Sequence, residues 1–282
     1  MAHDQPRIAV RARDGHEFEL IEVGCTAPER TLLMLPGMGM AARHYIGFAQ
    51  ALNSDGCRVL IHEWRGNGAS SWRASRRRDW GYPELLEFDL EASLQHARSR
   101  ADGGKVWLAG HSLGAQLACL LAARRPADVA GLTLIAGGSP YWRTFPWPER
   151  FGLLALLHCA PLLARAFGHF PGRRLGFAGR EAHGVMLDWA RTGRHGHYGL
   201  VQPGFQAEPA LAELALPLLA VQMARDRFVP EHSRDWLLTR LKSCQVTIVD
   251  QEEAPGEDHF SWLDRPAVTA RAVAAWLNRQ SG

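Results

Sequence analysis

The sequence lacks the features that mark several special classes of protein. Its cysteines are few and widely scattered, and no CxxC pair occurs. That spacing argues against a disulfide framework and against a zinc site, so we expect reduced thiols. A net charge of +3 is too small to indicate a nucleic-acid partner. The cysteines are Cys25, Cys57, Cys119, Cys159 and Cys244.

The N-terminus also lacks the apolar run of a secretory signal. Residues 1–10 include the polar side chains His3, Asp4 and Arg7. We therefore expect no signal peptide, and we expect a cytoplasmic protein.

What the sequence does contain is an alternation of apolar runs and helical patterns. With 282 residues, of which 46% are hydrophobic, the chain can bury a large core. Near-continuous apolar runs suit strands that are covered on both faces, and their alternation with helices predicts a doubly wound, mostly parallel α/β fold. Residues 7–23 alternate in polarity around Asp14-Gly15, which predicts an N-terminal hairpin. The predicted strands are 31–36, 58–64, 105–110, 131–137, 217–223 and 244–250, and the predicted helices are 41–52, 83–98, 113–123, 231–242 and 266–278.

One interval, 139–213, contains no apolar run suited to the sheet and is rich in aromatic residues. A structureless loop of this length is uncommon in a compact domain, so we predict a mostly helical cap inserted before the strand that carries the acid. Its apolar segment 153–167 is too short and too interrupted to span a bilayer, and we expect two helices around Pro161. Two alternatives remain open for this segment: it could form a surface that faces a membrane, or it could form a homodimer through the cap. The predicted core then comprises residues 1–138 and 214–282.

Ser112 stands at the junction of a predicted strand and a predicted helix. Residues 110–114, GHSLG, match the Gly-x-Ser-x-Gly pattern, in which a sharp turn lifts the serine hydroxyl above the sheet. The glycines are required because flanking side chains would collide in so tight a turn. The strand before this turn and the helix after it supply a context that the short pattern by itself lacks. Ser112 is therefore the predicted nucleophile.

A nucleophilic serine needs a base, and the base needs an orienting acid, in the chain order Ser, Asp, His for this fold. Asp226 follows the strand 217–223, and His259 lies in the loop after the last strand. Asp250 and Asp258 are competing acids, but Asp258 is adjacent to His259 and would point elsewhere. We predict that His259 is the base and Asp226 the acid; a helix cap or a surface ion pair is the other interpretation of Asp226.

The loop 35–40, LPGMGM, is the candidate for an oxyanion hole because it follows an early strand and precedes a helix. One donor would be the backbone N–H of Leu113, directly after the nucleophile, and the other the N–H of Met38. Taken alone, a Gly-rich turn here could equally be a tight loop without function. The residues expected to line a substrate pocket are His111, Trp142, Phe145 and Trp147.

Five segments together resemble the α/β-hydrolase superfamily over nearly the whole chain: LPGMG, HEWRGNGASS, GHSLGAQLA, DRFVP and GEDHF. The segments DWGYPELLEFDLEASL and FGHFPGRRLG…LDWARTGRH further resemble a bacterial group of predicted α/β hydrolases with poorly defined substrates. The resemblance implies Ser112 as nucleophile, His259 as base and Asp226 as acid. Two positions depart from the pattern, because Pro36 stands in place of the usual histidine and Glu63 in place of the usual aspartate.

These residues predict a serine hydrolase that cleaves a carboxylic ester through an acyl-enzyme, without a cofactor. The aromatic cap favours a small-molecule ester with an apolar or lipid-like group. An acyltransferase or a thioesterase would use the same triad, and a non-catalytic scaffold that binds a ligand or partner through the cap is the alternative from another class. We expect no metal, because His183, His195 and His197 lack neighbours at metal-ligand spacing. We also expect no nucleic-acid partner and no transmembrane segment.

Overall fold

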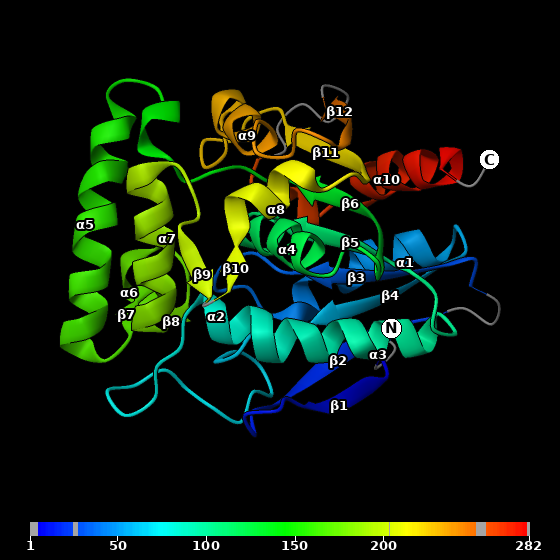
Figure 1. Cartoon of the computed structure of the whole chain (residues 1–282), viewed down its shortest axis with the longest axis horizontal. Coiled ribbons are helices and arrows are strands. Elements are labelled where there is room, and N and C mark those ends of the chain that lie inside the picture. The colour runs from blue at the N-terminus through cyan, green and yellow to red at the C-terminus, as the bar shows by residue number, and fades with distance from the viewer. Residues whose placement is uncertain (1–4, 25–27, 203, 252–257, 281–282) are drawn as a thin grey trace.

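The computed structural model describes residues 5–24, 28–202, 204–251 and 258–280, so the expectations for Cys25 and for residues 1–4 lie outside it. Within the described residues, eight strands form one central sheet in the order β1-β2-β4-β3-β5-β6-β11-β12 (Figure 1). This confirms the predicted doubly wound α/β fold. The strands are β1 (Arg7–Arg11), β2 (Glu17–Val23), β3 (Arg30–Leu35), β4 (Cys57–His62), β5 (Val106–His111), β6 (Val129–Ile135), β11 (Pro217–Met223) and β12 (Gln245–Gln251).

The sheet combines an antiparallel hairpin with a parallel body. β1 and β2 form the predicted N-terminal hairpin, and β2 pairs antiparallel with β4. From β4 to β12 all neighbouring strands are parallel. β4 ends at His62, earlier than predicted, and Glu63 and Trp64 leave the sheet to enter the loop that supports the site.

Helices cover both faces of the sheet, which explains why the strands at its centre, such as β3, β5, β6 and β11, are largely apolar and buried. Along β3, the buried Leu33 and Leu35 belong to the core on one face, whereas Leu32 and Met34 belong to the core on the other. The first face packs against α3 and α4, and the second against α1 and α10 (Figure 1). The helices of the core are η1 (Ala42–Tyr45), α1 (Ile46–Asn53), α2 (Tyr82–Glu84), the π-helical η2 (Leu85–Leu90), α3 (Glu91–Arg100), α4 (Leu113–Arg124), α9 (Glu231–Leu238), η4 (Ser261–Leu263) and α10 (Ala267–Arg279).

Within its described residues, the interval 139–213 adds no strand to the central sheet. α5 and α7 lie beside each other at one end of the molecule (Figure 1). The last helix, α8, packs on α4 instead, so the end of the interval returns to the core. The elements are η3 (Trp142–Thr144), α5 (Glu149–Phe167), β7 (Phe170–Pro171), α6 (Gly172–Leu175), β8 (Arg180–Glu181), α7 (His183–His195), β9 (Leu200–Gln202), β10 (Phe205–Gln206) and α8 (Ala207–Glu213).

The expectation of two helices around Pro161 is wrong, because α5 runs unbroken through this residue. Proline cannot donate the hydrogen bond that would satisfy the carbonyl of Leu157 one turn earlier. The guanidinium of Arg194, on α7, donates to that carbonyl at 2.6 Å instead. α5 is therefore 19 residues long, and by length and composition alone it could cross a membrane; 22% of its apolar window is buried within the fold.

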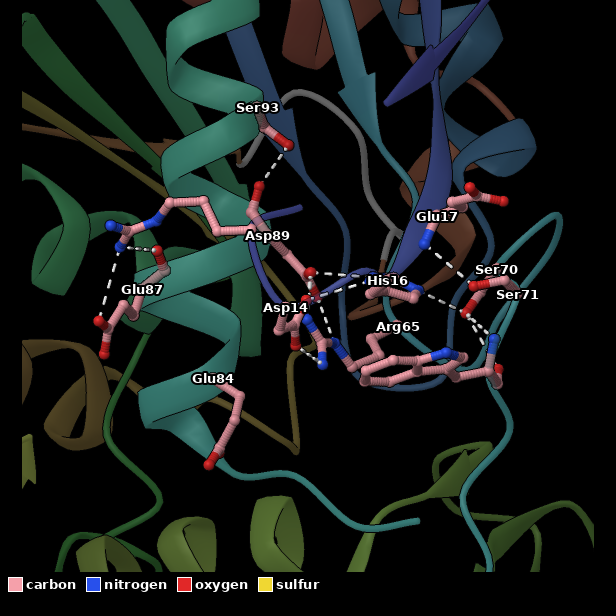
Figure 2. Close-up of polar contacts among 12 residues, drawn as sticks. Asp14, His16, Glu17, Arg65, Ser70, Ser71, Glu84, Glu87, Asp89 and Ser93 are labelled. Atoms are coloured by element: carbon pink, nitrogen blue, oxygen red, sulfur yellow. Dashed lines mark hydrogen bonds and ion pairs between the residues drawn. The ribbon is translucent and has the colours of Figure 1, made fainter. Parts of the chain in front are cut away.

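A buried ionic cluster fastens the loop after β4 to the N-terminal hairpin and to η2. Arg65 binds both oxygens of Asp89, with Nε 2.8 Å from Oδ2 and Nη2 2.6 Å from Oδ1. Arg65 also donates to Asp14, and His16 bridges Asp89 and Ser70 (Figure 2). Burial by itself raises the pKa of Asp89, but the hydrogen bonds with Arg65 and His16 outweigh it and hold this pKa below its ordinary value. The loop is thus held by an ion pair, Arg65 with Asp89, whose side chains are 1% and 0% exposed.

The loop held by this cluster supports both the site and the cap. Trp64 Nε1 donates to the carbonyl of Pro36 at 2.9 Å, at the start of the predicted oxyanion loop. Arg180, on β8, donates to the carbonyl of Ala74 through Nε at 3.1 Å and through Nη2 at 2.8 Å. The chain between β4 and α2 therefore links the cap to the loop beside Ser112.

Candidate active site

Ser112 occupies a strained turn between β5 and α4. Its backbone lies at φ 54° and ψ −117°, a conformation that residues with a side chain rarely adopt. A Cβ at Gly110 would lie 2.3 Å from the carbonyl oxygen of Gly114, and a Cβ at Gly114 would lie 2.1 Å from that of Leu35. Both glycines are thus required by close approach of the backbone, and the turn presents Ser112 to a pocket.

Ser112, His259 and Asp226 form one hydrogen-bonded chain. Ser112 Oγ lies 2.9 Å from His259 Nε2, and His259 Nδ1 lies 2.8 Å from Asp226 Oδ2. The other carboxylate oxygen, Oδ1, accepts the N–H groups of Phe228 and Val229, each at 2.8 Å. A carboxylate held in this way accepts a hydrogen bond from Nδ1–H, so the ring proton stays on Nδ1 and the Nε2 lone pair faces the serine hydroxyl.

Neither competing acid contacts His259. Asp258 Oδ1 accepts the N–H groups of Phe260 and Ser261 at the start of η4, and these hydrogen bonds lower the pKa of Asp258. Asp250 pairs with Arg234 at 3.2 Å. The acid that the structure places beside the His259 ring is Asp226, the one predicted from its position after a strand.

His111 is fully buried beneath the turn, and both of its ring nitrogens are engaged. Nε2 lies 2.8 Å from the carbonyl of His259, so it carries the proton and donates it. Nδ1 then accepts from the hydroxyl of Tyr45 at 2.7 Å, and that hydroxyl accepts the N–H of Gly37 at 2.8 Å. Burial, more than the neighbouring His259, holds the pKa of His111 well below its ordinary value, so the ring is neutral. His111 therefore positions the His259 loop, and Tyr45 is a positioning residue that the sequence reasoning missed.

The backbone N–H groups of Met38 and Leu113 are the candidates for the oxyanion hole. Met38 and Leu113 both line the pocket next to Ser112. Within the described part of the chain, neither N–H donates a hydrogen bond to another residue. The loop that carries Met38 is held from behind, because Glu63 Oε1 accepts the N–H of Ala42 at 3.1 Å and Gly37 is bound to Tyr45. Glu63, at the position of the usual aspartate, thus serves to hold this loop.

The pocket at Ser112 is an apolar cavity of about 290 Å³. Of the four residues predicted to line it, Phe145 does. His111 is enclosed below the turn, the half-buried Trp142 lies against Phe151, and Trp147 is 69% exposed, so the structure places these three away from the wall. The wall residues that sequence reasoning missed include Gln116, Glu149, Leu153, Leu156, Phe177, Trp189, Arg227, Phe228 and Phe260. Phe228 and Phe260 lie close in the sequence to the predicted acid and base. This closeness could have predicted that they line the pocket.

The histidines that were weighed as metal ligands lie apart from the site. His183 pairs with Asp79 at 3.3 Å, and the rings of His195 and His197 lie 5.9 Å apart. Among the residues that the structure describes, no group of three or more His, Cys, Asp or Glu side chains could hold a metal ion.

Comparison with known proteins agrees with this architecture. The model of the "Alpha/beta hydrolase family" matches residues 32–272. The chain belongs to the alpha/beta hydrolase family. A curated relative, the chloroplastic pheophytinase of Arabidopsis thaliana, is 30% identical in an alignment of 142 residues that covers 42% of this chain. The match spans 29% of that relative's own length.

Solved structures of other alpha/beta hydrolases share the fold over almost the whole chain. The thermophilic esterase from Thermogutta terrifontis has a TM-score of 0.67 and 17% identity, covering 98% of this chain and 99% of the esterase. The haloalkane dehalogenase DatA from Agrobacterium tumefaciens C58 has a TM-score of 0.71 and 16% identity, covering 99% of this chain and 98% of the dehalogenase. At such identities the likeness shows the fold, so the reaction must be argued from the site.

Proposed function

We propose that this protein is a serine hydrolase that cleaves a carboxylic ester with an apolar acyl or alcohol group. The observation that carries the proposal is the hydrogen-bonded chain from Ser112 through His259 to Asp226, at a strained turn that opens on an apolar pocket. A hydroxyl nucleophile at this position forms an ester with an acyl group, which favours acyl transfer. Esterases are among the structural neighbours, which agrees with this choice.

In the first half-reaction, Ser112 Oγ attacks the ester carbonyl carbon while its proton passes to His259 Nε2. The carbonyl electrons move to the oxygen, whose negative charge is stabilised by the N–H groups of Leu113 and Met38. As the tetrahedral intermediate collapses, the C–O bond to the alcohol breaks and His259 returns the proton to the departing oxygen. In the second half-reaction, water repeats these steps and releases the carboxylic acid from Ser112.

The electrostatics around His259 suit this cycle. The imidazolium formed during attack is paired with Asp226, whose two carboxylate oxygens are already satisfied. His111, with its ring centroid 4.8 Å from that of His259, is neutral because of its burial and adds no opposing charge. His111 therefore adds no second positive charge beside the imidazolium.

The wall of the pocket sets the substrate class. Phe145, Phe177, Leu153 and Leu156 line the space beside Ser112, and the polar members of the wall include Gln116, Glu149 and Arg227. An acyl chain or an apolar alcohol would be removed from water on this wall, at about 25 cal/mol per Å² of apolar surface buried. We propose lipid-like esters as the preferred substrates.

The experiment is labelling with a fluorophosphonate together with hydrolysis of a p-nitrophenyl ester. Wild type should be labelled at one serine and should release nitrophenol, whereas Ser112→Ala should do neither and should keep its thermal melting temperature. Labelling at another serine would refute the assignment of Ser112. Transfer of the acyl group to an added alcohol or hydrolysis of a thioester alone would favour an acyltransferase or a thioesterase. Folded wild type without labelling or turnover would favour a scaffold that binds its ligand through the cap.

A further inference from the structure

Helix α5 is long and mostly apolar, although most of it is not buried. One side, with Leu153 and Leu156, lines the pocket, and a second side, with Leu157 and Ala160, is buried in the core next to α7. The third side is exposed and carries the apolar Phe151, Ala155, Cys159, Leu162 and Ala166 together with the polar His158 and Arg165. It therefore presents apolar side chains next to a basic one, as a helix that lies in a membrane interface does.

The exposed apolar surface extends beyond this stripe. Trp147, just before α5, is 69% exposed, and its ring lies 4.7 Å from that of Phe151. On α5 itself, Leu162 is 67% and Phe167 58% exposed. Large aromatic and leucine side chains that gather on one element mark an interaction site more often than single exposed residues do.

The mouth of the pocket adjoins this surface. Gly152 is exposed on α5 next to Phe151, and it also lines the pocket. Phe228 and Phe260, whose rings lie 5.3 Å apart, line the pocket as well and are partly exposed. A body that covers the exposed side of α5 would therefore lie against the entrance to Ser112.

Arginines accompany these apolar side chains. From residue 141 to residue 176 the sequence has one acid, Glu149, and the arginines Arg143, Arg150, Arg165, Arg173 and Arg174. Arg165, Arg173 and Arg174 are exposed. In a two-fold dimer this surface would meet its own copy and bring like charges together, because both partners use the same patch. An anionic lipid surface complements both the apolar side chains and the positive charge.

We infer that the exposed side of α5, together with Trp147 and the arginines at its C-terminal end, docks on an anionic lipid surface. The helix would lie in the plane of the interface, with its apolar side chains among the acyl chains and its arginines at the headgroups. It would not cross the bilayer, because its other two sides are committed to the pocket and to the core. The entrance to Ser112 would then face the lipid. Docking does not depend on the proposed chemistry.

The test measures sedimentation of full-length Ser112→Ala with vesicles, so that hydrolysis cannot change the lipid. Vesicles that contain phosphatidylglycerol should bind the protein, and vesicles of phosphatidylcholine alone should bind it far less. Leu162→Glu combined with Phe167→Glu should weaken binding by about tenfold or more, because both apolar side chains would leave the lipid. Replacing Arg165, Arg173 and Arg174 by glutamine should weaken it by about a hundredfold. These five residues lie outside the pocket wall.

The matched control is Ile248→Glu, on the edge strand β12, where the side chain is 44% exposed and lies outside the cap. It should leave vesicle binding unchanged.

Equal binding to both vesicle types, or binding that survives the α5 substitutions, would overturn the inference. A dimer in solution that Leu162→Glu dissociates, without vesicle binding, would assign this surface to a second copy. Protein that resists extraction by high salt would indicate a spanning helix instead. With the serine intact, the α5 variants should still hydrolyse a soluble ester, so a failure of docking and a failure of the proposed reaction are distinguishable.

Discussion

Replacing Asp226 by asparagine should reverse the proton pattern of His259. Asp226 Oδ1 accepts the N–H groups of Phe228 and Val229, so an asparagine keeps its single oxygen there and turns its NH₂ toward His259 Nδ1. Nδ1 must then accept, and the ring proton moves to Nε2. At 2.9 Å from Ser112 Oγ, a protonated Nε2 can no longer accept the serine proton.

The expected magnitude follows from the loss of the general base. In a serine protease the same substitution lowers turnover by about 10⁴-fold, which corresponds to roughly 5 kcal/mol of transition-state stabilisation. The side-chain volume hardly changes, so the melting temperature should stay near that of wild type. The assay is kcat/KM for a short-chain p-nitrophenyl ester, read beside the rate of fluorophosphonate labelling.

The control for this prediction is Asp258→Asn. Asp258 holds the N–H groups of Phe260 and Ser261 but does not contact the His259 ring, and an asparagine oxygen can accept the same two bonds. Its turnover should fall by less than about tenfold, since general-base catalysis is preserved. If Asp258→Asn instead proved the more damaging of the two, or if Asp226→Asn kept near wild-type turnover, the assignment of the acid would be refuted.

Three further predictions concern the buried cluster, the cap and the pocket. Asp89→Asn would remove one of the two carboxylates that pair with the buried Arg65 and leave Asp14 as the other, so denaturant unfolding should show a loss of about 3 kcal/mol; a loss under 1 kcal/mol would contradict the cluster's role. Burial raises the pKa of Glu181 from its ordinary 4.5 to about 7, so ionisation costs stability as the pH rises through that interval. Glu181→Gln should therefore raise the melting temperature at pH 8, by about 2 °C or more, and should have no effect at pH 4; an equal effect at both values would exclude this titration. Phe145→Ala should change relative kcat/KM across an acyl-chain-length series by several-fold while sparing a small activated acetate, whereas uniform loss would indicate a folding role.

The features that were predictable from sequence are those with local causes. Gly110 and Gly114 are demanded by the tightness of one turn, and that turn appears with Ser112 at positive φ. Asp226 and His259 follow the ends of parallel strands, and parallel strands bring their C-terminal ends to one edge of a sheet. Their positions along the chain therefore sufficed to predict that they would meet.

The features that sequence reasoning missed depend on contacts between distant segments. The helix that was expected to break at Pro161 continues because Arg194, from α7, satisfies the carbonyl that proline leaves open. Trp142 and Trp147 follow the same strand as Phe145, yet only the packing of α5 decides which of the three faces the pocket.

Tyr45 shows the same limit most plainly. Nothing in its neighbourhood along the chain indicates a role, because its hydroxyl acts on Gly37 and His111, and His111 in turn holds the loop of His259. Periodicity and short motifs predict which side chains lie on the buried or the exposed face of a strand or helix. Which partner each side chain meets is decided when elements far apart in the chain pack together, because a buried polar group needs a hydrogen-bond partner from whichever segment lies beside it.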